Sequence, residues 1–162
     1  MSRMTEFMMG FTLAFATMVV YAPAQDQPSV LPPKTVPGAL NPGIDQATIQ
    51  TTICKRGWTA TVRPPVDYTD KLKLKLLHAA GLSDSDAKRF ELDHLIPLEL
   101  GGNPYDPRNL WIEPWNGNQG AHVKDQLEDR LNHLVCSGKL SLAAAQHAIA
   151  SDWIAAYRVY VK

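Results

Sequence analysis

The chain has 162 residues, of which 45% are hydrophobic and 20% are charged, an ordinary globular balance with enough apolar residues for one core. This length leaves room for one domain and little more. Lys and Arg together number 16, as do Asp and Glu, so the net charge is zero, which argues against a generally basic chain that coats nucleic acid.

The N-terminal segment has the pattern of an export signal. A stretch from Phe7 to Tyr21, about 15 residues, is uncharged and largely apolar, and small residues follow at Ala22 and Ala24. A membrane span needs about 20 apolar residues, so an uncleaved anchor is the less favoured alternative. We therefore expect residues 1–24 to be a signal peptide and the mature protein to be periplasmic or secreted, with no membrane contact.

A proline-rich leader and then one domain follow the expected signal. Residues 25–43 predict a flexible segment, and residues 44–162 predict the domain. Its two cysteines, Cys54 and Cys136, form an even set, and in an oxidising compartment a disulfide is the default. Closing a loop of about 80 residues stabilises the fold by roughly 4.5 kcal/mol in the chain-entropy model. Two buried free thiols are the alternative.

The first elements of the domain are short. Alternation from Trp58 to Val62 predicts a strand that ends before Pro64. Thr69 as N-cap and Gly81 past the end predict a helix over residues 70–80, although the leucine alternation from Leu72 also fits a strand. Ser83 is expected to cap a short helical turn.

The centre of the chain predicts a β-hairpin that leads into a helix. One strand is expected over residues 90–97, a glycine- and proline-containing loop over 99–108, and a second strand over 110–113. Helical spacing then predicts a helix over 121–135 and a last helix from about 141 to 160. The predicted fold class is α+β: a mostly helical single domain built around this hairpin and helix, with one disulfide.

This central segment also carries the residues suited to hydrolysis of a phosphodiester. Such a reaction needs a base for water, a cation at the phosphate and a group that orients the base. Imidazole titrates near neutral pH and suits the base, while carboxylate, amide and imidazole groups hold divalent ions. The sequence supplies these groups at Asp93, His94, Asn109, Asn118 and His122. Asn118 and His122 are four apart and would share one helix face.

These residues resemble the HNH endonuclease motif, also called the ββα-metal motif. The resemblance rests on Asp93-His94 with Pro97, on Gly101-Gly102, and on Asn109-Leu110, and the intervals of 15 and 13 residues from His94 through Asn109 to His122 are similar to those in colicin nuclease domains. It implies a ββα-metal fold in which His94 activates water and Asn109 positions His94. Asp93, His122 and Asn118 would then hold the metal.

The resemblance implies a nuclease of low sequence specificity whose expected substrate is DNA, with RNA as the alternative. Colicins have histidines where this chain has Asp93 and Asn118, so the expected metal moves toward Mg²⁺ or Mn²⁺, with Zn²⁺ or Ni²⁺ less favoured. Arg89 and Lys124 are weak candidates for phosphate contacts, a solvated surface being the alternative. An inhibitor protein is left open as a further partner.

Each candidate also has a structural interpretation. Asp93 can cap a turn or pair with Arg108, Asn109 can be a turn residue, and Asn118 can be a helix N-cap. His122 serves a site only if Asn118 or Asp93 lies beside it. The alternative to an enzyme is therefore a non-catalytic exported binding domain on a degenerate HNH scaffold.

Overall fold

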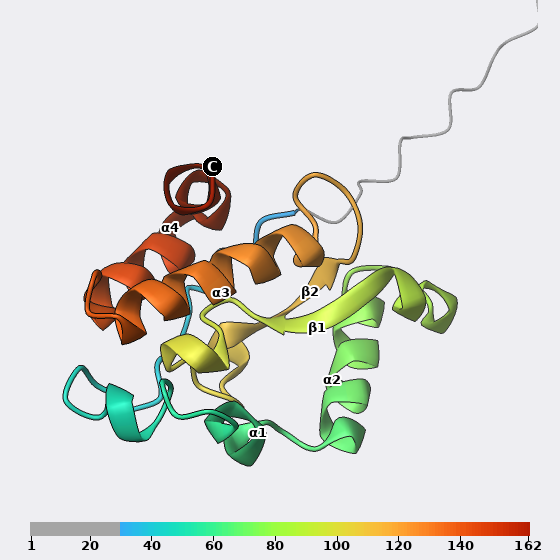
Figure 1. The fold of residues 1–162 in the computed structure, drawn as a ribbon. Helices are drawn as coiled ribbons and strands as arrows, with labels where there is room; N and C mark the ends of the chain where they lie inside the picture. The colour runs from blue at the N-terminus through green and yellow to red at the C-terminus, as the bar shows by residue number, and fades with distance from the viewer. Residues whose placement is uncertain (1–29) are drawn as a thin grey trace, which may run out of the picture.

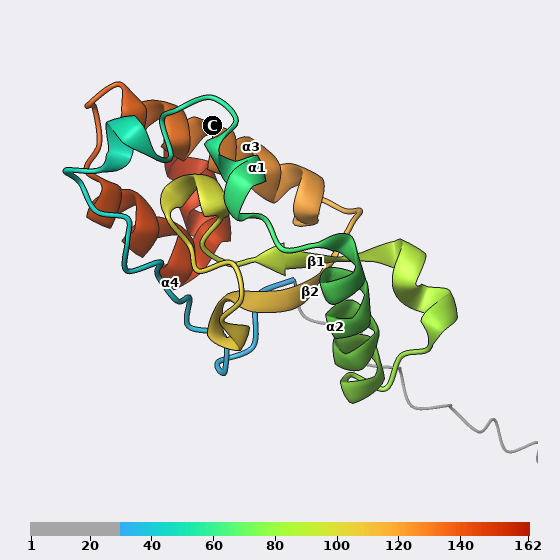
Figure 2. The same cartoon turned by 90° about the horizontal axis from the view of Figure 1, so that it is seen from below.

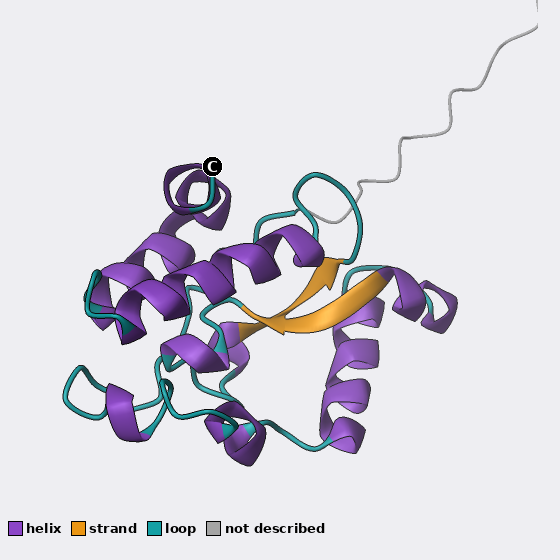
Figure 3. Ribbon diagram, in the orientation of Figure 1, coloured by secondary structure: helices purple, strands orange, loops and turns teal. Residues whose placement is uncertain are grey.

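The computed structural model describes residues 30–162, in which helices surround one two-stranded antiparallel sheet (Figures 1 and 3). The expected α+β class with one disulfide is therefore confirmed. The expected signal peptide and residues 25–29 lie outside the described residues. Within residues 30–162, no helix is long and apolar enough to cross a membrane.

The hairpin consists of β1 (Phe90–His94) and β2 (Leu110–Pro114), paired in register from Phe90 opposite Pro114 to His94 opposite Leu110. It lies between helix α2 (Val66–Ala79) on one side and helix α3 (Ala121–Cys136) on the other, as the two perpendicular views in Figures 1 and 2 show. The chain passes from β2 through a short turn into α3, in the order that the sequence predicts.

The main core lies between α3 and α4 (Leu142–Tyr160), which run side by side in Figure 1. Leu127, Leu131 and Val135 of α3 are fully buried there, because their spacing places them on one face of the helix. This core contains Ile49, Ile53, Ile96, Leu100, Leu127, Leu131, Val135, Leu142, Ala145, Ile149, Trp153 and Ala156. Helix α4 is interrupted at Asp152, whose side chain accepts a hydrogen bond from the Ala155 amide.

Two expectations for the first helices are corrected. Residues Trp58–Val62 form a helix, α1, and not a strand. Gly57 begins it in the left-handed region, and among residues 30–162 no strand lies beside it to complete a ladder. Helix α2 begins at Val66 after the extended Pro65, so Thr69 is inside the helix and is not its N-cap. Ser83 does cap the short 3-10 helix Asp84–Arg89, as expected.

The described part of the expected leader lies against the domain. Val36 and Ala39 are buried, and the segment exchanges backbone hydrogen bonds with the loop between the strands. Gly38 donates to the Arg108 carbonyl at 2.9 Å, and Asn103 donates to the Ala39 carbonyl at 2.8 Å. Residues 38–41 are therefore joined by backbone hydrogen bonds to the loop that follows His94.

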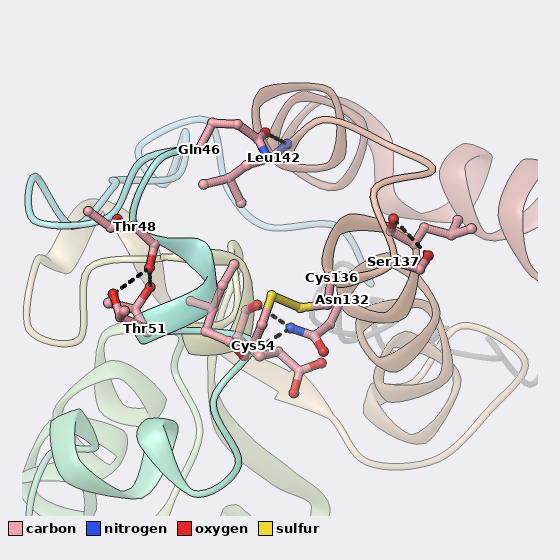
Figure 4. Close-up of a disulfide and its surroundings, with 12 residues drawn as sticks. Gln46, Thr48, Thr51, Cys54, Asn132, Cys136, Ser137 and Leu142 are labelled. Atoms are coloured by element: carbon pink, nitrogen blue, oxygen red, sulfur yellow. Dashed lines mark hydrogen bonds between the residues drawn. A yellow bond between two sulfur atoms is a disulfide. The ribbon is translucent and has the colours of Figure 1, made fainter.

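The expected disulfide between Cys54 and Cys136 is present, with Cα atoms 5.5 Å apart across 82 positions of sequence (Figure 4). It joins the end of α3 to the segment just before α1. One helical turn earlier, Asn132 donates hydrogen bonds to the Ile53 carbonyl at 3.4 Å and the Glu99 carbonyl at 2.7 Å. The bridge and this amide together tie α3 to two loops on the α1 side of the molecule.

Candidate functional site

His94 is the last residue of β1, and its imidazole is held in one orientation. Its Nε2 lies 3.1 Å from the Pro104 carbonyl oxygen. Since a carbonyl only accepts hydrogen bonds, Nε2 carries the proton and Nδ1 of the neutral ring is unprotonated. The side chain is buried, which lowers the pKa of His94 below the ordinary value of 6.5. His94 is therefore neutral, with one basic nitrogen, at neutral pH.

Asn109 fixes the loop that follows His94. Its Oδ1 accepts from the Ile96 amide at 2.9 Å, and its Nδ2 donates to the Ile96 carbonyl at 2.9 Å and the Asn103 carbonyl at 3.1 Å. The side chain is completely buried, so these bonds are not exchanged for water. Asn109 thus clamps the backbone two residues after the imidazole and one residue before the Pro104 carbonyl.

Backbone conformation and close packing explain why glycines occupy positions 101 and 102 in this loop. Gly101 adopts a left-handed φ of 76°. A Cβ on Gly102 would come within 1.8 Å of the Ile96 carbonyl oxygen and 2.8 Å of Asn109 Nδ2. No larger residue fits at position 102 without displacing the clamp.

His94 lines a polar cavity of about 210 Å³ on the α3 side of the hairpin. We call this cavity the acidic pocket, because five carboxylate side chains line it and Arg63 is its one lining cation among the described residues. Asp93 and His94 both line it although they are adjacent in sequence, because β1 ends at His94 and the chain turns there. Its lining residues are Thr59, Arg63, Glu91, Leu92, Asp93, His94, Pro97, Leu98, Glu99, Asp125 and Glu128.

Lys124 is buried between α3 and the hairpin, with 1% of its side chain exposed. Its Nζ lies 2.6 Å from Asp93 Oδ2 and 3.0 Å from the His94 carbonyl oxygen, and it also pairs with Glu128. Burial opposes the charge of Lys124, but Asp93 and Glu128 outweigh it and raise the pKa of the ammonium. Burial also opposes ionisation of Asp93, yet Lys124 lowers the pKa of that carboxyl. Both groups are therefore charged.

Three more acids beside Asp93 are held partly in their neutral forms. Burial, then the Asp93 charge, raises the pKa of Glu91 to about 7 and that of Glu113 to about 10. Burial raises the pKa of Glu99 to about 7. The single positive charge of Lys124 does not balance the negative charges of all these carboxylates. Some of the carboxyls therefore hold a proton and are neutral.

Glu91, Asp93 and Glu113 form a carboxylate group able to hold a metal ion. One oxygen from each lies within 4.8 Å of the other two. They share one face of the hairpin, since Glu91 and Asp93 are two apart on β1 and Glu113 is opposite Glu91. Glu113 is completely buried and makes no hydrogen bond of normal geometry among residues 30–162, but protonated Glu113 lies close enough to Asp93 to donate toward its carboxylate, which contributes to its raised pKa. A buried carboxyl of this kind is costly unless a proton or a cation satisfies it.

The two other expected metal ligands lie apart from this group. Asn118 is exposed in the turn before α3, so it does not share a helix face with His122 as the spacing predicted. It lines a different cavity, beside Tyr157 and Arg158. The His122 side chain is 64% exposed, lies 3.9 Å from Asp125 and packs on the Trp115 ring. Lys124, and neither of these two, is the α3 residue that contacts Asp93.

The expected phosphate contacts are also placed differently. Arg89 forms an ion pair with Asp86 at 3.0 Å outside the acidic pocket. Lys124 is too deeply buried to meet a phosphate. Asp93 does not pair with Arg108, which binds Asp106. Sequence reasoning missed Arg63, Asp125 and Glu128 as lining residues and Glu91 as a site residue, although the spacing of Glu91 and Asp93 on one strand predicts a shared face. Glu99 and Glu113 flank the loop and could reach the site, but they were not predicted as site residues.

The largest cavity near the described residues, about 580 Å³, lies on the α2 side of the hairpin. Its lining is mostly apolar, and its one charged lining residue, Arg108, is paired with Asp106. It offers no catalytic group, so the smaller acidic pocket is the candidate site.

Comparison with protein-family models, curated proteins and solved structures gives no match to this chain.

Proposed function

We propose that this protein is an exported, metal-dependent nuclease of the HNH kind that hydrolyses phosphodiester bonds in DNA, with RNA as the alternative substrate, and with little sequence preference. One observation carries the proposal: the neutral imidazole of His94, with Nε2 bound to the Pro104 carbonyl, lines a pocket of carboxylates beside a carboxylate group able to hold a cation. A base with a fixed tautomer next to a cation site is what activation of water at a phosphate requires.

In this reaction, Nδ1 of His94 takes a proton from water as the water oxygen forms its bond to phosphorus. The phosphorus–oxygen bond to the leaving 3′ oxygen breaks and that oxygen takes a proton from solvent water, which would give a 5′-phosphate and a 3′-hydroxyl as the HNH resemblance implies. The Asp93 carboxylate, which favours the charged ring, stabilises the imidazolium formed in this step. Asn109 donates hydrogen bonds to the Ile96 and Asn103 carbonyls, and so fixes the position of the Pro104 carbonyl relative to the His94 imidazole.

The residues present fit a hard divalent cation. Glu91, Asp93 and Glu113 supply only oxygen ligands, which favours Mg²⁺ or Mn²⁺ over Zn²⁺ or Ni²⁺. The carboxyl of Glu113 is the buried group that such an ion would satisfy. When bound, the ion would supply positive charge at the scissile phosphate and the leaving oxygen.

A second candidate function is a non-catalytic exported binding domain on the same scaffold. The ion pair between Lys124 and Asp93 favours it, because a built-in ammonium already neutralises the carboxylate next to His94. In that case the acidic pocket would be a structural polar interface, and no divalent ion would be needed.

Plasmid nicking by the purified mature protein distinguishes the two. With Mg²⁺ or Mn²⁺ we expect nicking that EDTA abolishes and that His94→Ala lowers by about 100-fold or more. His147→Ala, an exposed histidine on α4, is the matched control and should keep full activity. If wild-type protein cuts neither DNA nor RNA with any common divalent ion, the nuclease proposal fails and the binding domain is favoured.

A further inference from the structure

Arg63 brings a positive charge into the acidic pocket from outside the hairpin and α3. It follows directly after α1, with an extended backbone, and lines the pocket together with Thr59 of that helix. Helix α1 and the residue after it, which the sequence predicts as a strand and its end, therefore bring two residues to the pocket. One of them is its only lining cation among residues 30–162.

The guanidinium of Arg63 is not committed to a protein partner. It forms no ion pair and donates no side-chain hydrogen bond within the described part of the chain, whereas Arg89 and Arg108 are paired with Asp86 and Asp106. Its charge nevertheless acts on the pocket, because it opposes protonation of His94 and favours ionisation of Glu99. An exposed arginine that lines a carboxylate-rich cavity without joining a carboxylate is available for another anion.

A phosphodiester needs such a group here. Carboxylates repel a phosphate, and Lys124 cannot offset them because its ammonium is buried and already paired. The planar guanidinium donates two parallel hydrogen bonds that match two phosphate oxygens. We propose that Arg63 binds the phosphate next to the scissile bond and so makes the pocket selective for a phosphodiester anion; this inference rests on the nuclease function proposed above.

The test measures binding separately from turnover. In a His94→Ala background with Mg²⁺, fluorescence anisotropy reports binding of a short labelled DNA duplex as a function of salt. We expect Arg63→Gln to weaken binding by about tenfold or more and to reduce the slope of log K against log salt by about 0.9, the value for one phosphate contact. Arg63→Lys should keep the salt dependence of binding but lose part of the affinity, because lysine retains the positive charge without the two parallel hydrogen bonds of the guanidinium.

The matched control is Arg56→Gln, an exposed arginine seven positions earlier that does not line the pocket. If Arg63→Gln and Arg56→Gln bind alike while the wild-type protein cuts DNA, the inference about Arg63 is wrong and the nuclease proposal stands. Binding that depends on Arg63 without any cutting by the wild type defeats the nuclease proposal and the assignment of Arg63 to a scissile site, and leaves Arg63 as a phosphate contact of a binding domain. A wild type that neither binds nor cuts nucleic acid defeats both.

Discussion

The ammonium of Lys124 and the carboxylate of Asp93 form a buried ion pair, 2.6 Å apart, where α3 packs on the hairpin. Most helix–sheet interfaces exclude charges, because burial penalises each ion by several kcal/mol. Here Asp93, Glu113 and Glu128 surround one ammonium, and the apolar core lies elsewhere, between α3 and α4. The stability of this interface therefore depends on pairing between its charged groups and not on apolar contacts.

Lys124→Met tests how much the fold depends on this ammonium. Its removal leaves Asp93 and Glu128 buried without a counter-charge, so we expect the free energy of unfolding in EDTA to fall by about 3–5 kcal/mol. Urea denaturation measures the change. Mn²⁺ should restore more stability to this variant than it adds to the wild type, because the ion replaces the missing positive charge.

Lys139→Met, at an exposed position after α3, is the control and should change stability by less than about 0.5 kcal/mol. If Lys124→Met is as stable as this control, the ion pair does not support the interface. Equal effects of Mn²⁺ on the variant and the wild type would show that the ion binds away from these carboxylates.

The raised pKa of Glu113 leads us to expect a specific pH dependence of the free energy of unfolding in the absence of metal. Its folded-state pKa of about 10 lies above the ordinary value of 4.5, so the folded state holds a proton that the unfolded state releases between these values. Stability from this group is complete at low pH and is lost as pH rises toward 10. Glu113→Gln keeps a neutral side chain, so we expect a flatter profile and higher stability than wild type at about pH 9.

Denaturation in EDTA at about pH 6 and about pH 9 measures this effect. Glu91, with a pKa of about 7, and Glu128, with a pKa of about 8, act in the same direction and keep part of the slope in the variant. Asp67→Asn, an exposed carboxyl on α2, should leave the slope unchanged. A Glu113→Gln profile as steep as that of the wild type contradicts a protonated Glu113.

We expect the oxidised protein to have a much larger free energy of unfolding than the variant with both Cys54→Ser and Cys136→Ser, because the variant lacks the disulfide. The bridge closes a loop of 82 positions, and the chain-entropy model gives about 4–5 kcal/mol for such a loop. Guanidinium denaturation measures the difference, with dithiothreitol-treated wild type as a second comparison. A loss below about 1 kcal/mol would mean that the reduced chain keeps its ends together by other contacts.

The hairpin, α3 and the disulfide were predictable because each has a local or compositional signal. Phe90–His94 alternates, α3 has helical spacing, and two cysteines after an expected export signal favour a bridge. The helix at Trp58–Val62 was not predictable in this way. Five residues are too few to distinguish a helical period from the alternation of a strand.

The candidate site was predicted in part. His94, Asn109 and Asp93 lie together because the hairpin register fixes them, and the register follows from the strand pattern. Asn118 and His122 do not join them, because Asn118 lies in the turn before α3 and the His122 side chain is on the exposed face of that helix. Lys124, two residues after His122, is on the face that packs against the hairpin and contacts Asp93, which the spacing of the motif does not predict.

Asn109 gives the sharpest test of how the loop supports His94. Asn109→Asp keeps the size and the Oδ1 acceptor for the Ile96 amide but removes the bonds that Nδ2 donates to Ile96 and Asn103. It also puts a negative charge against two carbonyl oxygens in a fully buried position. We expect a loss of at least about 2 kcal/mol of stability and a large loss of nicking activity.

The control Asn116→Asp, at an exposed position in the turn after β2, should retain both properties. Mn²⁺ binding separates the role of Asn109 from a general failure to fold, because the carboxylates lie on the strands and α3 and not on the clamped loop. We therefore expect folded Asn109→Asp protein to bind Mn²⁺ with wild-type affinity while its activity is lost. A variant that keeps its activity would show that His94 is oriented by the strand alone, with no contribution from the Asn109 clamp.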